Sequence, residues 1–166
     1  SNIYKNFNND NKPHFIHGVT SSGKTEIYLK IVSYFFQKNK SCLILVPEIM
    51  LSSQIYKRFQ EYFGNKVLLW HSQSSKSNKN ETWNKINQGD PYIVVGARSA
   101  VFVPLQNLGA IIVDEEHDSS YKESEKQPTY NARDVAIVRA RFSQSIVILG
   151  SATPSLETYY NAITNK

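Results

Sequence analysis

One eight-residue segment limits the possible folds of this chain more than any other feature. It reads GVTSSGKT from Gly18 to Thr25 and fits the pattern G-x-x-x-x-G-K-[ST]. A short strand, Phe15–His17, is expected before it, and a helix, Lys24–Lys38, after it. Glycines let successive backbone N–H groups point inward at phosphate oxygens, and the helix start adds its positive dipole end. The segment therefore predicts a nucleotide phosphate site.

Each residue type in this segment has a chemical task. The side chain of Lys24 is expected to reach the β- and γ-phosphates, and the hydroxyl of Thr25 is expected to ligate Mg²⁺. The predicted phosphate-binding residues are Gly18, Val19, Thr20, Ser21, Ser22, Gly23, Lys24 and Thr25.

Short apolar runs alternate with amphipathic stretches along the rest of the chain. Unbroken apolar runs are typical of strands buried on both faces, so the pattern predicts an α/β fold with a mainly parallel sheet sandwiched between helices. The expected strands are Phe15–His17, Ser41–Val46, Val67–Trp70, Tyr92–Val95, Leu108–Val113 and Ile146–Leu149. The expected helices are Lys24–Lys38, Leu51–Phe63, Glu81–Gln88, Tyr130–Phe142 and Pro154–Ile163, the last with Thr153 as N-cap. Polar loops are expected at His71–Asn80 and Ser119–Thr129. Residues 1–12 are expected to form a loose lead-in that opens on a cloning scar, and residues 13–166 to form one domain.

A cluster of acidic residues follows the apolar run Leu108–Val113 and reads Asp-Glu-Glu-His-Asp. A carboxylate at such a strand end holds Mg²⁺ through a water, and the next one orients and deprotonates the attacking water. We assign the first task to Asp114 and the second, catalytic with Lys24, to Glu115. His117 is expected to be a hydrogen-bonding relay rather than a metal ligand, because the other histidines lack ligand-like spacing to it.

Composition excludes several classes of protein. Hydrophobic residues make up 40 % of the chain, enough for a core, and no apolar run is long enough to span a membrane. The single cysteine, Cys42, excludes a disulfide framework and a cysteine-based zinc cluster. No secretory leader opens the sequence, so the cytoplasm is the expected compartment. The net charge of +5 fits nucleic-acid binding and a merely solvated surface equally well.

The two motifs are shared by kinases, motor ATPases, GTPases and helicases. No Asn-Lys-x-Asp guanine reader occurs, which argues against a GTPase, and the scarcity of arginine argues against a kinase with an arginine-rich lid.

Further segments resemble the motifs of superfamily 2 helicases. Gly150–Ser155 is similar to their Ser-Ala-Thr motif, Asp114–His117 to their Asp-Glu-x-His box, Leu45–Leu51 to motif Ia and Val95–Phe102 to motif Ib. Together with YNARDVA these segments run from Gly18 to Thr158 in the order of the primosomal replication-restart helicases, the family that the chain resembles.

The resemblance implies the first RecA-like lobe of a 3′-to-5′ DNA helicase that uses ATP and Mg²⁺, and no zinc in this chain. It also implies a longer protein that reloads the replication machinery at stalled forks. The implied partners are single-stranded and forked DNA, a second helicase lobe, and other primosome and single-strand-binding proteins, with no membrane. Because stepping needs two lobes that open and close, the isolated lobe is expected to have little activity.

The resemblance also assigns residues. The residues implied to couple ATP state to DNA state are His117, Ser151, Ala152 and Thr153. The residues implied to approach DNA are Pro47, Glu48, Arg98, Ser99, Tyr121, Tyr130 and Arg133, with the tyrosines stacking on bases. The segment Ser119–Asp134 matches the family's aromatic-rich loop, although Asn131 replaces a histidine there.

Two other functions stay open. One is a nucleotide-gated module that binds DNA or a partner protein without useful turnover. The other is a superfamily 2 translocase that moves on duplex DNA.

Overall fold

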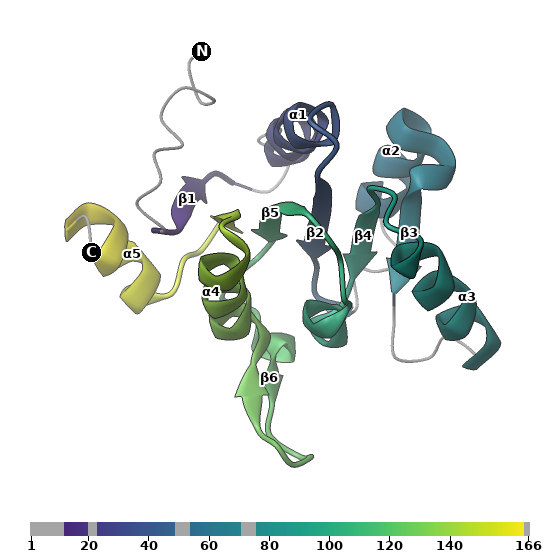
Figure 1. Cartoon of the computed structure of the whole chain (residues 1–166). Coiled ribbons are helices and arrows are strands. Elements are labelled where there is room, and N and C mark those ends of the chain that lie inside the picture. The colour runs from purple at the N-terminus through teal and green to yellow at the C-terminus, as the bar shows by residue number, and fades with distance from the viewer. Residues whose placement is uncertain (1–11, 20–22, 49–53, 71–75, 165–166) are drawn as a thin grey trace.

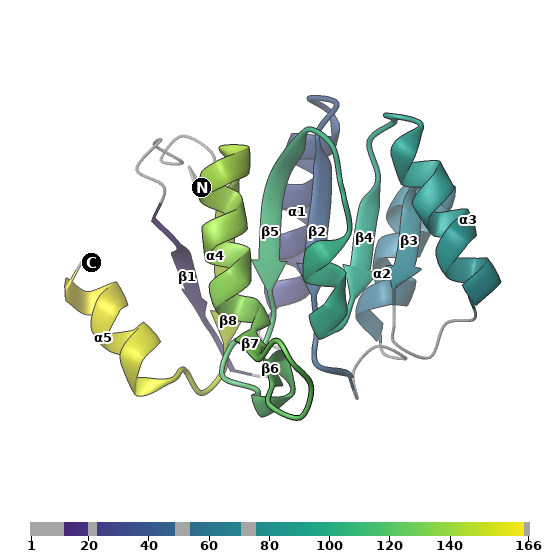
Figure 2. The same ribbon diagram turned by 60° about the horizontal axis from the view of Figure 1, so that its bottom comes forward.

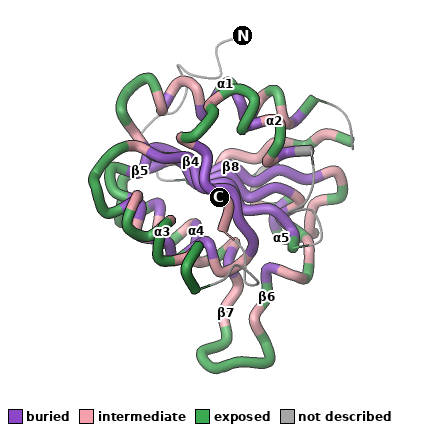
Figure 3. Tube along the Cα trace, turned by 90° about the vertical axis from the view of Figure 1, so that its right-hand side faces the viewer, coloured by how far each residue is buried: buried purple, intermediate pink, exposed green. Residues whose placement is uncertain are grey.

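The structure is a computed structural model, and it describes residues 12–19, 23–48, 54–70 and 76–164. Its centre is a six-stranded sheet in the order β1-β8-β5-β2-β4-β3, in which every neighbouring pair is parallel. The strands are β1 (His14–His17), β2 (Ser41–Leu45), β3 (Val67–Trp70), β4 (Ile93–Gly96), β5 (Leu108–Val113) and β8 (Ile146–Ser151). Every residue of β2, β4 and β5 is buried, as the apolar runs predict (Figure 3).

Helices cover both faces of the sheet (Figures 1 and 2). They are α1 (Lys24–Phe36), α2 (Gln54–Phe63), α3 (Lys76–Asn87), α4 (Ala132–Ser143) and α5 (Leu156–Thr164). Helices α1 and α2 lie on one face, α3 and α4 lie on the other, and α5 lies beside the edge strand β1. None of the helices in the described part of the chain is long and apolar enough to cross a membrane.

Alternate residues of each strand enter two separate apolar cores. On β2, Leu43 and Leu45 pack with Ala136 of α4 and Ile86 of α3, whereas Ile44 packs with the α1 and α2 side. Burial on both faces is the reason that the strands read as continuous apolar runs instead of alternating ones. The predicted α/β sandwich is therefore confirmed.

The carboxyl ends of the parallel strands meet at one edge of the sheet. The phosphate-loop segment follows β1, the acidic cluster follows β5, and the Ser-Ala-Thr segment begins at the end of β8. Because β8 lies between β1 and β5, these segments, far apart in sequence, become neighbours. This is the edge where ligands bind in open α/β sheets.

A small antiparallel hairpin extends from this edge, away from the sheet (Figures 1 and 3). It consists of β6 (Lys122–Glu123) and β7 (Tyr130–Asn131), and a 3₁₀ turn, Ser119–Tyr121, precedes it. The expected loop Ser119–Thr129 thus contains a turn with a buried residue, Tyr121, and one strand of the hairpin.

Several element boundaries differ from those expected. Helix α3 begins at Lys76, so the loop expected through Asn80 is wrong for its described part. Ile86 is the only buried residue of α3. The first turn of the helix is therefore polar and mostly exposed, and it shows no helical spacing of apolar residues in the sequence. Residues 1–11, 49–53 and 71–75, and the calls that fall on them, lie outside the described residues.

Two helix starts are displaced by capping side chains. The Oδ1 of Asn131 accepts from the backbone N–H of Arg133, so α4 begins at Ala132 and not at Tyr130. The Oγ of Ser155 accepts from the N–H of Thr158, which makes Ser155 and not Thr153 the cap of α5.

Candidate active site at the carboxyl edge of the sheet

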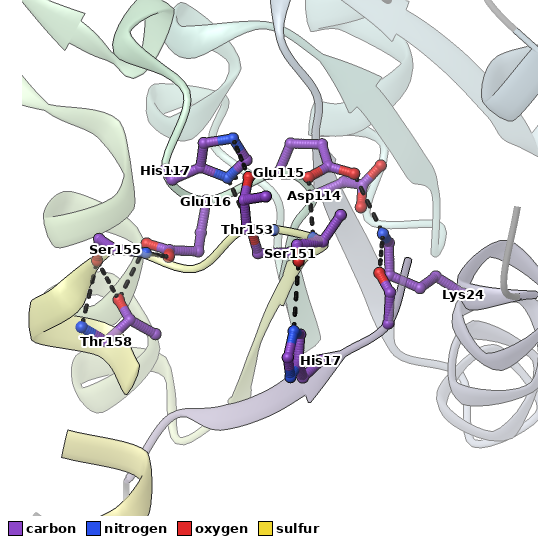
Figure 4. Close-up of polar contacts among 12 residues, drawn as sticks. His17, Lys24, Asp114, Glu115, Glu116, His117, Ser151, Thr153, Ser155 and Thr158 are labelled. Carbon is purple, nitrogen blue, oxygen red and sulfur yellow. Dashed lines mark hydrogen bonds and ion pairs between the residues drawn. The ribbon is translucent and has the colours of Figure 1, made fainter. Parts of the chain in front are cut away.

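Lys24 is the first residue of α1, and its side chain points toward Glu115 (Figure 4). Its Nζ donates to the backbone oxygen of Gly18 at 2.8 Å and to Oε1 of Glu115 at 3.1 Å. Gly23, just before it, has a φ of 84°, a left-handed conformation that favours glycine. The chain thus turns sharply into the helix, as the motif predicts, while Thr20, Ser21 and Ser22 lie outside the described residues.

Asp114 follows β5 and is almost completely buried. Its Oδ1 accepts from the hydroxyl of Tyr28 at 2.8 Å, and its backbone oxygen accepts from the hydroxyl of Tyr121 at 2.6 Å. Burial raises the pKa of the Asp114 carboxyl, the Tyr28 hydrogen bond opposes that rise, and the charge of Glu115 adds to it. Tyr28 therefore holds the carboxylate of Asp114, and Tyr121 holds its backbone.

Glu115 bridges two of the motif segments. One carboxylate oxygen contacts Lys24, and the other, Oε2, accepts from the backbone N–H of Ala152 at 3.3 Å. Its φ of 46° lies in the left-handed region, where a residue with a side chain is strained. The strained turn directs the carboxylate toward the phosphate loop.

Three of the four predicted coupling residues form one hydrogen-bonded group, and the fourth, Ala152, is bonded to residues outside it. His117 contacts Ser151 Oγ through Nδ1 at 2.7 Å and Thr153 Oγ1 through Nε2 at 3.1 Å. Ser151 Oγ also accepts from the N–H of Thr153 at 3.1 Å, and the Ala152 oxygen contacts Nε2 of His17 at 3.3 Å. A neutral His117 with its hydrogen on Nε2 satisfies both contacts, because Ser151 then donates to Nδ1. Their coupling role stays a prediction.

Sequence reasoning missed Glu116, the middle residue of the cluster. Its side chain is 0 % exposed, and its oxygens accept from the Ser155 N–H at 3.0 Å, the Thr158 hydroxyl at 3.0 Å and the Arg133 guanidinium at 3.1 Å. Glu116 therefore joins the starts of α4 and α5 to the end of β5. In the sequence, the one sign of this role is that Ser155 and Thr158 are three residues apart, the spacing of a helix N-cap and the residue whose N–H it binds.

Two of the residues expected at DNA have other roles here. Tyr121 is 0 % exposed, so its ring has no free face for a base in this conformation, and its stacking on DNA stays a prediction that the structure does not support. The guanidinium of Arg133 is held by Glu116, Asp134 and Glu157, which leaves it a structural cation between α4 and α5.

The other expected DNA residues lie nearer the surface, with the exception of Pro47, which is buried. Arg98 donates to the Lys122 oxygen at 2.7 Å and to Glu123 Oε2 at 2.8 Å, so it fixes the base of the hairpin. Tyr130 is half-buried against Phe102, with ring centroids 5.0 Å apart. Glu48 is exposed and Ser99 is half-buried.

Comparison with known proteins places the chain in a family. A family description, DEAD/DEAH box helicase, matches residues 2–162. The chain belongs to the DEAD/DEAH box helicases. Helicases of this family use ATP with Mg²⁺.

Two curated relatives of this helicase chain are named replication restart protein PriA. The chain is 49 % identical to the protein of Chlamydia pneumoniae over 92 % of its own length and 53 % identical to that of Synechocystis sp. over 87 %. It spans 20 % and 17 % of those two proteins. A solved structure of RecG bound to a three-way DNA junction matches with a TM-score of 0.64 and 21 % identity, covering 93 % of this chain and 20 % of that one. That likeness supports the RecA-like helicase fold.

The residues at this edge of the helicase lobe fit Mg²⁺. Among the described residues, no three His, Cys, Asp or Glu side chains gather as a metal site. Mg²⁺ seldom needs such a cage, because it is bound by one or two carboxylates, waters and the phosphates of the nucleotide. A buried, oriented Asp114 near the hydroxyl-bearing start of α1 is a donor set of that kind.

Proposed function

We propose that this chain is the ATP-binding lobe of a two-lobed DNA helicase and binds Mg·ATP between the phosphate loop and Asp114–Glu115. The observation that carries the proposal is the position of Glu115, whose two oxygens contact Lys24 and the Ala152 N–H. One carboxylate thereby contacts the residue expected to hold phosphate and the segment expected to respond to DNA.

Each residue has a role in this proposal. Lys24 and the backbone N–H groups of Gly18–Thr25 hold the phosphates, and Thr25 with Asp114 holds Mg²⁺, which would neutralise phosphate charge when bound. Glu115 orients the attacking water and accepts its proton. A phosphate at Lys24 competes with Glu115 for the ammonium group, so ATP binding frees the carboxylate for that task.

A change at Glu115 reaches the coupling residues directly. Its contact with Ala152 links it to the Ser151–His117–Thr153 group, and Glu116 holds Ser155, two residues after Thr153. We propose that this chain of bonds transmits the nucleotide state along the edge of the sheet toward DNA.

The proposed DNA contacts are the members of the implied set other than Tyr121 and Arg133. Arg98 keeps 30 % of its side chain exposed, and a DNA phosphate could replace Glu123 as its anionic partner. Tyr130 offers a partly exposed ring for stacking, and the remaining members are Pro47, Glu48 and Ser99. Pro47 would contribute through its backbone, because its side chain is buried.

The activity of the longer protein is proposed from its relatives. The chain covers about a fifth of the PriA proteins that it resembles. We propose that the longer protein unwinds forked DNA with 3′-to-5′ polarity during replication restart, together with other primosome and single-strand-binding proteins. A second lobe would close over ATP and supply arginines.

Hydrolysis and ATP binding by Glu115→Gln in the longer protein test this function. We expect single-stranded DNA to stimulate hydrolysis by the wild type, and the variant to lose about 10²- to 10⁴-fold while still binding ATP. Glu26→Gln, at an exposed carboxylate of α1, is the matched control and should hydrolyse normally. Wild-type turnover in Glu115→Gln would contradict the motor proposal and favour a nucleotide-gated binding module.

The two-lobe requirement has its own test. The 166-residue chain alone should hydrolyse ATP slowly, because an arginine from another lobe contributes about 10³–10⁵ in rate. Strand displacement on a DNA fork by this chain alone would contradict the requirement.

A further inference from the structure

Tyr28 is a buried titratable residue that no motif accounts for. It lies on α1 one turn after Lys24, and it is 0 % exposed. Its hydroxyl crosses from α1 to the end of β5 and donates to Oδ1 of Asp114 at 2.8 Å. The helix that carries the phosphate-binding lysine therefore also holds the candidate metal carboxylate.

Gly150 makes room for this contact. A Cβ placed on Gly150 would lie 1.8 Å from the Tyr28 hydroxyl oxygen and 3.3 Å from Asp114 Oδ1. Gly150 does not have a positive φ, so its backbone conformation is open to other residues and the requirement is one of space. Any side chain at this position would push the hydroxyl away from the carboxylate.

The Tyr28 bond leaves a defined task for the other carboxylate oxygen. Because Oδ1 already accepts from Tyr28, Oδ2 would be the more open acceptor for a metal ion or its water. Tyr121 fixes the backbone of the same residue through the Asp114 carbonyl. An aspartate held at both its side chain and its backbone loses little freedom when a metal binds, which favours binding.

We propose that Tyr28 is a positioning residue for the Mg²⁺ carboxylate, Asp114, and that Gly150 is glycine to admit the Tyr28 hydroxyl. The proposal rests on the proposed function, since it assumes that Asp114 acts on nucleotide-bound Mg²⁺. It adds a rigid connection between α1, which carries Lys24 and Thr25, and the carboxylate that completes the metal site.

The test titrates Mg²⁺ into the 166-residue chain with a fluorescent ATP analogue and reads nucleotide binding. Tyr28→Phe should raise the Mg²⁺ concentration for half-saturation about tenfold, the usual loss when a partner of a metal ligand is removed. Binding of the analogue in EDTA should stay unchanged, because Lys24 and the loop are intact. Tyr34→Phe is the matched control, since it removes a hydroxyl from a residue about 9 Å further along the same helix and should titrate as wild type.

Gly150→Ala tests the proposal independently. It should weaken Mg²⁺ binding as Tyr28→Phe does, and it should lower the midpoint of thermal unfolding. In the double variant the added methyl group meets the ring carbon at 3.0 Å and no longer meets the hydroxyl at 1.8 Å. The double variant should therefore regain part of the stability that Gly150→Ala loses. Its loss of Mg²⁺ binding should be smaller than the sum of the losses in the two single variants.

The outcomes separate this inference from the proposed function. Mg²⁺-dependent binding by the wild type with an unchanged half-saturation in Tyr28→Phe would overturn the positioning role alone. If Mg²⁺ does not change nucleotide binding by the wild type, both the positioning role of Tyr28 and the proposed function are overturned.

Discussion

Lys24 Nζ lies 3.1 Å from Glu115 Oε1, so the lysine of the phosphate loop and the carboxylate expected to activate water form an ion pair. The two side chains are only 9 % and 16 % exposed, so solvent screens the pair weakly. In the proposed site, ATP and Glu115 would therefore compete for the same ammonium group.

This competition predicts that Glu115→Gln binds ATP more tightly. An amide accepts a weaker hydrogen bond than a carboxylate and brings no negative charge near the phosphates, so we expect a gain of about 3- to 10-fold. Equilibrium binding of a fluorescent ATP analogue measures it, with Glu26→Gln as the control. Weaker binding in Glu115→Gln would show that Glu115 supports nucleotide binding and does not oppose it.

Tyr121→Phe separates a packing role from a DNA role. The variant leaves the buried Asp114 carbonyl without this donor and should lose about 1–3 kcal/mol of unfolding free energy, measured in urea. Single-stranded DNA binding by the longer protein should not change, because the ring is fully buried. A clear loss of DNA affinity at unchanged stability would restore the base-stacking role.

Glu116→Ala should be among the most destabilising substitutions at this edge. It removes a buried carboxylate and leaves the Arg133 guanidinium, 13 % exposed, without its buried partner, so we expect a loss of about 3–5 kcal/mol. Glu157→Ala removes a partner of the same arginine that is 72 % exposed, and should cost under about 1 kcal/mol. Equal losses in the two variants by chemical denaturation would refute the assignment of Glu116 as a structural centre.

Cys42 should report global unfolding. It is the single cysteine of the chain, it is fully buried in β2, and burial raises the pKa of its thiol to about 12. The reactive thiolate is therefore scarce at pH 8, and access requires opening of the sheet. A disulfide reagent should label the native chain far more slowly than the urea-unfolded chain. Rapid labelling of the native chain would contradict the buried position of β2.

Much of this fold could be predicted because its signals are local. Six apolar runs became six parallel strands, and the turn at Gly23 followed from the spacing of the phosphate-loop motif. The start of α3 was missed because its first turns are polar on every side and carry no period.

The contacts that organise the candidate site could not be predicted in the same way. Tyr28 and Asp114 are 86 positions apart, and Glu116 and Thr158 are 42 apart, so only the folded sheet brings them together. Tyr121 lies in a polar stretch, where one aromatic residue gives no sign of whether it faces the core or a ligand. The motifs thus located the site, whereas its supporting shell depended on tertiary packing.

Nucleotide binding by Lys24→Ala tests the central claim most directly. The measurement is equilibrium binding of a fluorescent ATP analogue with Mg²⁺ to the 166-residue chain, beside Lys30→Ala at an exposed lysine of the same helix. The account predicts that Lys24→Ala loses at least about tenfold in affinity, because a charge-assisted bond to phosphate is removed, while Lys30→Ala binds as wild type. Equal affinity in Lys24→Ala and the wild type would contradict the assignment of this edge as the ATP site.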